Sequence, residues 1–217
     1  MRPSALTLAP EVSEEELKAL KESIFSVPLR GKHLEIGTAA GGTLRELMTG
    51  YDEPRPPFVV VDTFEYFPNQ RAAVEKNLRD AGIDPADIDI REGRSWDLCR
   101  KALRDREKFD FIFIDGHHGA NYVMKDLRWT RMLSPGGLVC LHDYKPDFPG
   151  VIWATERFLK QNPNYEKITH TGTLVILRKM REGRQEVSWK EVIAGEVFAK
   201  RLTMKKSLNK RLRRTKS

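Results

Sequence analysis

The sequence is poor in cysteine and has no long apolar run. Its 217 residues include two cysteines, Cys99 and Cys140, which lie too far apart in the sequence to form a metal-binding or redox motif. No segment approaches the ~18 consecutive apolar residues of a membrane span. The first residues, MRPSALTLAPEVSEEE, lack the apolar core of a secretory signal. We therefore expect a cytoplasmic protein with one buried core.

Acidic residues are scarce near the C-terminal end. Residues 178–217 contain 14 Lys and Arg but only 4 Asp and Glu. Of the chain's 38 basic and 31 acidic residues, 24 basic and 27 acidic ones therefore lie in residues 1–177. The net charge is therefore +10 in the tail and −3 in the remainder. We expect a main domain in residues 1–180 and a basic, helical, partly flexible extension in residues 181–217.

The sequence leaves the partner of this basic extension open. Residues 203–217 hold seven basic residues and no acidic one, a run that suits nucleic-acid phosphates, an anionic membrane surface or a solvated extension. No aromatic residue lies in this run, so stacking on single-stranded bases is not indicated. Upstream of it, Ser188 and Glu191 form a capping box, and the apolar spacing predicts a helix that packs on the core or on another subunit of a homo-oligomer.

Strand-like and helix-like segments alternate through the main domain. Ser13 and Glu16 form a capping box, which predicts a first helix. Continuous apolar segments, typical of strands buried on both faces, then alternate with helical patterns; they include KHLEIG, FVVVD, FDFIFID and GLVCLHD. YEKITHT and TLVILRK, separated by a turn at Gly172, predict an antiparallel pair. This order predicts an α/β fold with a mostly parallel sheet covered on both faces.

The carboxyl ends of the predicted strands carry the candidate site, because ligands of such sheets bind there. The glycine-rich turn EIGTAAGGT follows the first strand and lets a ligand approach the backbone. Ala39 occupies the second glycine position of the dinucleotide fingerprint, which disfavours a nicotinamide-dependent dehydrogenase. Asp62 ends the second strand 25 residues after Gly37, where a carboxylate suits the two hydroxyls of a ribose. A packing turn and a helix-capping aspartate are the structural alternatives.

Several motifs between residues 33 and 145 together carry a family resemblance: E-I-G-T-x-x-G-G-T, V-V-V-D-T-F, I-D-G-x-H, D-L-x-W-x-x-x-L-x-P-G-G and H-D-Y. On these motifs the chain resembles class I S-adenosylmethionine-dependent methyltransferases, specifically methyltransferase family 24. The resemblance implies a three-layer Rossmann-like methyltransferase fold, with a seven-stranded, mostly parallel sheet and an antiparallel last pair. It also implies an S-adenosyl-L-methionine site. The residues expected there are Glu35, Gly37, Thr38, Gly41, Asp62, Gly93, Ser95 and Asp115.

Acid and imidazole groups after two neighbouring strands predict how a methyl acceptor would be activated. The sulfonium methyl is already a good electrophile, so the enzyme must position the acceptor and manage its proton. His118 lies on the histidine of I-D-G-x-H and His117 on its variable position; either is a candidate base. The alternative to a histidine base is a divalent metal such as Mg²⁺, held by Asp115, His142 and Asp143, which would lower the pKa of the acceptor hydroxyl.

Comparison with the related sugar and macrolide O-methyltransferases leaves the metal open. These enzymes resemble this chain at Asp115, but they carry an acidic pair where this chain has His142 and Asp143. Replacing a carboxylate by imidazole weakens a site for a hard cation and shifts preference toward a softer metal.

The sequence therefore predicts an S-adenosylmethionine-dependent methyltransferase that acts on a hydroxyl of a small molecule or sugar. Two alternatives use the same fold. One is an RNA methyltransferase that uses the basic tail for affinity, and the other is a binding protein without catalysis. The acceptor and the oligomeric state are not indicated by any motif.

Overall fold

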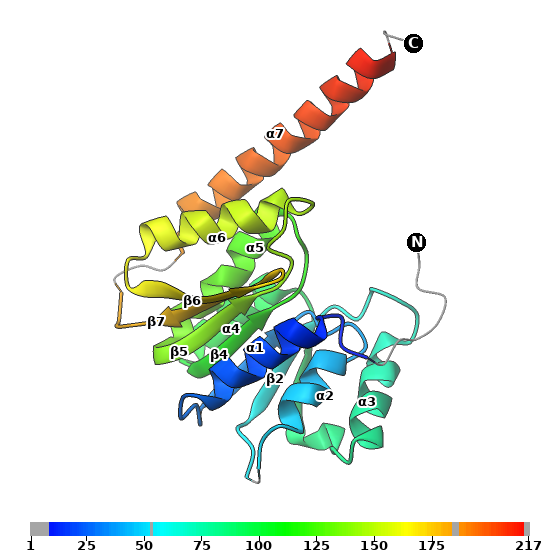
Figure 1. Cartoon of the computed structure of the whole chain (residues 1–217), viewed down its shortest axis with the longest axis vertical. Helices are drawn as coiled ribbons and strands as arrows, with labels where there is room; N and C mark the ends of the chain where they lie inside the picture. Colours follow the sequence, from blue (N-terminus) through cyan, green and yellow to red (C-terminus); the bar gives the residue numbers. More distant parts are fainter. Residues whose placement is uncertain (1–8, 53, 184–186, 215–217) are drawn as a thin grey trace.

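The structure is a computed structural model that describes residues 9–52, 54–183 and 187–214; side chains are described as far as residue 205. One seven-stranded sheet forms its centre (Figure 1). Its strands are β1 (Lys32–Ile36), β2 (Phe58–Asp62), β3 (Ile88–Glu92), β4 (Phe109–Ile114), β5 (Leu133–Leu141), β6 (Tyr165–Thr171) and β7 (Leu174–Lys179). The order is β3-β2-β1-β4-β5-β7-β6. Strands β1 to β5 are parallel, whereas β7 runs antiparallel to both β5 and β6. The predicted fold class is confirmed.

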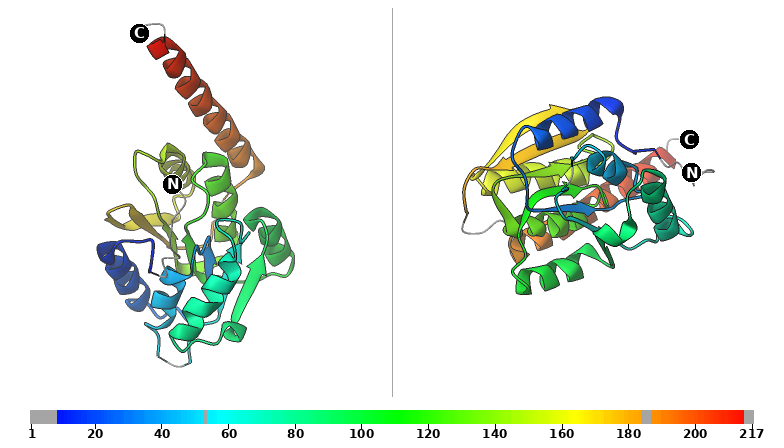
Figure 2. Two further views of the ribbon diagram at one scale, coloured as in Figure 1. Left: turned by 90° about the vertical axis from the view of Figure 1, so that its right-hand side faces the viewer. Right: turned by 90° about the horizontal axis from the view of Figure 1, so that it is seen from below.

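Helices cover both faces of the sheet (Figure 2). They are α1 (Glu14–Phe25), α2 (Gly42–Met48), α3 (Gln70–Asp80), α4 (Ser95–Arg104), α5 (Ala120–Asp126), α6 (Pro149–Gln161) and α7 (Trp189–Arg214), with short 3-10 turns η1 (Pro85–Asp87) and η2 (Leu127–Met132). Side chains of α1, α2 and α3 form one buried cluster with the sheet, and those of α4, α5, α6 and the start of α7 form the other. The three layers bring the carboxyl ends of β1, β2, β4 and β5 to one edge.

Two elements are longer than the segments that predicted them. Strand β5 begins at Leu133, before the predicted segment GLVCLHD, and its pairing register with β4 shifts near its start. Helix α7 continues to Arg214, through most of the basic run that follows residue 202. Its Glu191 side chain pairs with Arg157 of α6. None of the helices in the described ranges is long and apolar enough to cross a membrane.

Candidate active site

The glycine-rich turn after β1 lies directly against the end of β4. Gly37 has φ +80°, and a Cβ built on it would lie 2.4 Å from the backbone oxygen of Asp115. Only glycine satisfies both the left-handed conformation and this close approach. Gly41, with φ +78°, then precedes the first residue of α2. The structure therefore brings two of the predicted cofactor residues, Gly37 and Asp115, together, whereas a Cβ built on Gly41 would face Val74 of α3.

Asp62 joins this turn to the end of β2. One carboxylate oxygen accepts a hydrogen bond from the Thr38 amide at 2.8 Å, and the other accepts one from the Phe64 amide at 2.7 Å. Gly93, at the end of β3, donates its amide to the Asp62 backbone oxygen at 2.8 Å. The predicted grouping of Thr38, Asp62 and Gly93 is therefore observed. Ser95 makes a different contact: its hydroxyl accepts a hydrogen bond from the indole of Trp129, 2.9 Å away.

Glu35 is a buried carboxyl group inside the same pocket. Its side chain is almost inaccessible, and one of its oxygens has no hydrogen-bond partner among the described residues. Burial, followed by the charges of Asp115 and Asp62, raises the pKa of Glu35 well above its usual value. The pocket extends from Glu35 over the glycine-rich turn to Ala9 and Glu11 of the N-terminal segment. An unsatisfied polar oxygen in a cavity of this kind suits a bound polar ligand.

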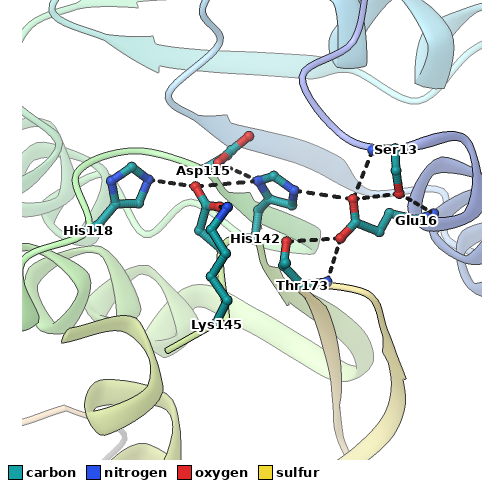
Figure 3. Close-up of polar contacts among 8 residues, drawn as sticks. Ser13, Glu16, Asp115, His118, His142, Lys145 and Thr173 are labelled. Carbon is teal, nitrogen blue, oxygen red and sulfur yellow. Dashed lines mark hydrogen bonds and ion pairs between the residues drawn. The ribbon is translucent and has the colours of Figure 1, made fainter. Parts of the chain in front are cut away.

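Asp115 and His142 form the centre of the polar cluster shown in Figure 3. Asp115 follows β4 and His142 follows β5, and the His142 Nδ1 lies 3.1 Å from an Asp115 carboxylate oxygen. The other ring nitrogen lies 3.5 Å from a Glu16 oxygen. Burial opposes the charged form of His142, but the bond to Asp115 and the charges of Asp115, Asp143 and Glu16 raise its pKa to about 9. His142 is therefore a cation held between carboxylates at neutral pH.

Asp143 holds His118 in place. Its carboxylate lies 2.7 Å from the His118 Nε2 and 2.8 Å from the Lys145 ammonium. Burial opposes ionisation, but these two bonds and the charges of the nearby histidines hold the pKa of Asp143 well below its usual range. The His118 ring also stacks on Phe148, with centroids 3.9 Å apart. If the Nε2–H donates to Asp143, neutral His118 has its lone pair on Nδ1, which is the arrangement that a general base requires.

His117 has different neighbours. Its Nδ1 accepts a hydrogen bond from the Gly119 amide at 2.9 Å, and its ring packs on Tyr122. Burial and the neighbouring His118 lower the pKa of His117. Within the described residues, no carboxylate is in ion-pair contact with His117, in contrast to His118.

Glu16 is the site residue that the sequence analysis assigned only to helix capping. The predicted capping box is present: Ser13 donates its amide to Glu16 at 2.8 Å, and Glu16 donates its amide to the Ser13 hydroxyl at 3.3 Å. The same carboxylate also accepts the amide and hydroxyl of Thr173 in the β6–β7 turn, at 2.5 and 2.9 Å, and contacts His142. No sequence signal links a capping glutamate to a turn 157 residues later. Lys145, two residues after Asp143, is the other missed residue.

Comparisons with known proteins give the family of the chain. A family model described as a methyltransferase domain, of methyltransferase family 24, matches residues 34–144. The chain belongs to this family, within the class I S-adenosylmethionine-dependent methyltransferases. A search of curated proteins gives no match.

Solved structures share the fold at low sequence identity. The O-methyltransferase from Bacillus cereus, solved with S-adenosylhomocysteine, is 19% identical over 78% of this chain and 83% of that chain, with a TM-score of 0.60. TomG from Streptomyces achromogenes, an O-methyltransferase of tomaymycin synthesis solved with S-adenosylmethionine, is 18% identical over 78% and 91%, with a TM-score of 0.56. The TDP-rhamnose 3'-O-methyltransferase CalS11 of calicheamicin biosynthesis is 17% identical over 75% and 76%, with a TM-score of 0.57.

Proposed function

We propose that this methyltransferase transfers the methyl group of S-adenosylmethionine to a hydroxyl of a small molecule or sugar. The observation that carries the proposal is the His118–Asp143 pair, which lies beside Asp115 and the cofactor turn. The structural neighbours are O-methyltransferases, one of them a TDP-rhamnose 3'-O-methyltransferase, and they support a hydroxyl acceptor. RNA as the acceptor has no comparable support in these comparisons.

The residues around the glycine-rich turn fit the cofactor. Glu35 offers a buried carboxyl oxygen without a partner among the described residues, and Gly37 and Thr38 line the same pocket. Asp62 already fixes the turn through the Thr38 amide, and its carboxylate is the group expected on the ribose. Gly93 lies beside it and would line the adenine. When bound, S-adenosylmethionine supplies an electrophilic methyl group, so the chain has to orient the acceptor and accept its proton.

His118 is the proposed base. Asp143 and Phe148 fix its ring orientation, and Asp143 stabilises the imidazolium that forms when His118 accepts the proton of the acceptor hydroxyl. His118→Gln is expected to lower kcat by 10²- to 10⁴-fold, the usual contribution of a general base. His117→Gln is the matched control and should change kcat only a few-fold. A large loss in the His117 variant and none in the His118 variant would reverse the assignment.

The cluster of Asp115, His142 and Asp143 also fits a divalent cation. Each residue offers one ligand atom, and these atoms lie within 4.8 Å of one another. Two carboxylates and one imidazole are suitable donors for Mn²⁺ or a softer divalent metal. A cation there would lower the pKa of the acceptor hydroxyl. To act as a ligand, His142 must give up its proton and its bond to Asp115.

The first experiment is calorimetric titration with S-adenosylhomocysteine, first in EDTA and then in Mg²⁺ and in Mn²⁺. We expect micromolar binding that Asp62→Asn weakens, whereas Asp80→Asn, an exposed carboxylate on α3, leaves it unchanged. Separate titrations of the metals into the protein should give heat that Asp115→Asn abolishes if the cluster binds a cation. Absence of S-adenosylhomocysteine binding in every buffer would refute the enzyme proposal and favour a binding protein that has lost catalysis.

A further inference from the structure

Helix α7 has one face that packs on the body of the protein. Val192 is fully buried, and a Cβ on Gly195 would lie 2.9 Å from the backbone oxygen of Ala120 at the start of α5. One turn later, Phe198 stacks on Trp153 of α6, with ring centroids 4.8 Å apart. These contacts fix the first half of the helix. The second half projects away from the sheet and its covering helices, as Figure 1 and the left view of Figure 2 show.

The opposite face of α7 carries exposed apolar side chains. These four residues, called the outer stripe below, are Trp189, Ile193, Val197 and Met204, with 56%, 53%, 44% and 72% of their surface exposed. At about 100° per residue they lie within one sector of the helix, roughly opposite the packed face. They make up half of the eight large apolar side chains that are exposed in the described part of the chain. Such a concentration on one helix indicates a contact surface.

Positive charge accompanies this outer stripe. Residues 197–217 contain nine Lys and Arg and no Asp or Glu. Lys200 lies in the same sector as the stripe, between Val197 and Met204, whereas Arg201 and Lys205 lie beside it; all three are exposed, on the part of α7 that leaves the body. The helix of 26 residues extends for about 39 Å. A partner of α7 therefore has to accept apolar side chains and a dense positive charge together.

We propose that α7 is a docking helix for an anionic lipid surface. A basic helix that exposes apolar side chains lies in the headgroup region with those side chains inserted and its Lys and Arg side chains on anionic headgroups. A second copy of the chain would bring two equally basic helices together, which like-charge repulsion opposes. A nucleic acid would use the positive charge but leave the outer stripe in water. Trp189 remains 56% exposed although its ring also packs on Trp96, with ring centroids 4.7 Å apart. Tryptophan is a residue type that favours membrane interfaces.

Docking would also orient the active site. The inner face of α7 touches Ala120, two residues after His118, so the lipid-bound helix would rest on the segment that supplies the proposed base. The acceptor side of the molecule would then be held at a constant distance from the lipid surface. The docking itself does not depend on the identity of the acceptor.

The test is co-sedimentation of the full chain with two kinds of vesicle, pure phosphatidylcholine and phosphatidylcholine with 30% phosphatidylserine, at about 0.1 M salt. We expect at least tenfold tighter binding to the anionic vesicles. Val197→Ser with Met204→Ser should weaken that binding about tenfold, and Lys200→Gln with Lys205→Gln should weaken it by a similar factor. Met180→Ser, an exposed methionine at the end of β7, is the matched control and should bind like the unaltered chain. Equal unfolding temperatures will show that the variants remain folded.

Three outcomes would overturn the proposal. The first is no sedimentation with anionic vesicles at low salt. The second is binding to a duplex RNA or DNA probe that is tighter than vesicle binding and insensitive to the Val197 and Met204 substitutions. The third is a concentration-dependent dimer, measured by ultracentrifugation, that these two substitutions dissociate.

Discussion

His33, at the start of β1, is a fully buried histidine that should make the fold sensitive to acid. Its ring packs against Phe58, Phe111 and Tyr51, with centroids 5.1 to 5.4 Å away. One ring nitrogen lies 3.0 Å from the Gly31 backbone oxygen, and the other lies 2.6 Å from the Tyr51 hydroxyl. Both contacts are satisfied by the neutral ring, in which one nitrogen donates and the other accepts. Burial lowers the pKa of His33 from 6.5 to about 4.

The size of the effect follows from this shift in pKa. The unfolded chain binds a proton at His33 below pH 6.5, whereas the folded chain does so only below about pH 4. Stability is therefore fully present above pH 6.5 and is lost as the pH falls, by about 1.4 kcal/mol per pH unit. Over the interval from 6.5 to 4 the loss is about 3 kcal/mol. His33→Phe removes the titrating group while keeping an aromatic ring of similar size.

The assay is urea unfolding at a series of pH values from 4 to 8. The variant loses two hydrogen bonds, so we expect it to be less stable than the unaltered chain at pH 8. This difference in unfolding free energy should shrink by about 3 kcal/mol as the pH is lowered to 4. Tyr51→Phe is the control, because it removes one hydrogen bond but keeps the buried histidine and its pH dependence. A difference between His33→Phe and the unaltered chain that stays constant across this pH range would refute the reasoning.

Two further predictions concern the site. Gly37→Ala should abolish S-adenosylhomocysteine binding in calorimetry, because the Cβ of the alanine would lie 2.4 Å from the backbone oxygen of Asp115. Gly136→Ala is the control: Gly136 has a similar φ of +83°, but a Cβ there would meet no atom within 4 Å, so this variant should keep binding. Glu16→Gln should lower the free energy of unfolding in urea by about 1–3 kcal/mol, because the amide leaves a buried donor without an acceptor. Glu15→Gln, exposed on the same helix, should change it by less than about 0.5 kcal/mol. Unchanged stability in the Glu16 variant would show that its bonds to Thr173 contribute little.

The fold was predictable because its signals are local and repeated. Most of the parallel strands are short, continuous apolar segments, and Gly37 after β1, Asp62 at the end of β2 and Asp115 after β4 place a polar or flexible residue at the same edge. The antiparallel pair β6 and β7 was marked by the turn at Gly172. The extent of α7 was harder to predict, because residues 203–205, the last whose side chains the structure describes, are all exposed and give no hydrophobic period.

The candidate site was only partly predictable, because some of its partners are distant in sequence. The grouping of Asp115, His142 and Asp143 followed from strand order alone. In contrast, the choice between His117 and His118 depended on side-chain direction, which the sequence does not specify. The contact between Ser95 and Trp129 likewise depends on how α4 packs against η2.

Glu16 contributes both to the stability of the fold and to the charge of the candidate site. Its carboxylate closes the first turn of α1, holds the β6–β7 turn through Thr173 and faces the buried ring of His142. Because one of its oxygens is fixed by Thr173, the other is held where it favours the charged form of His142. The His142 ring also pairs with Asp115, which lines the pocket over the glycine-rich turn. Glu16 and His142 therefore form a continuous chain of polar contacts from the N-terminal helix to Asp115, the carboxylate whose backbone lies against the glycine-rich turn.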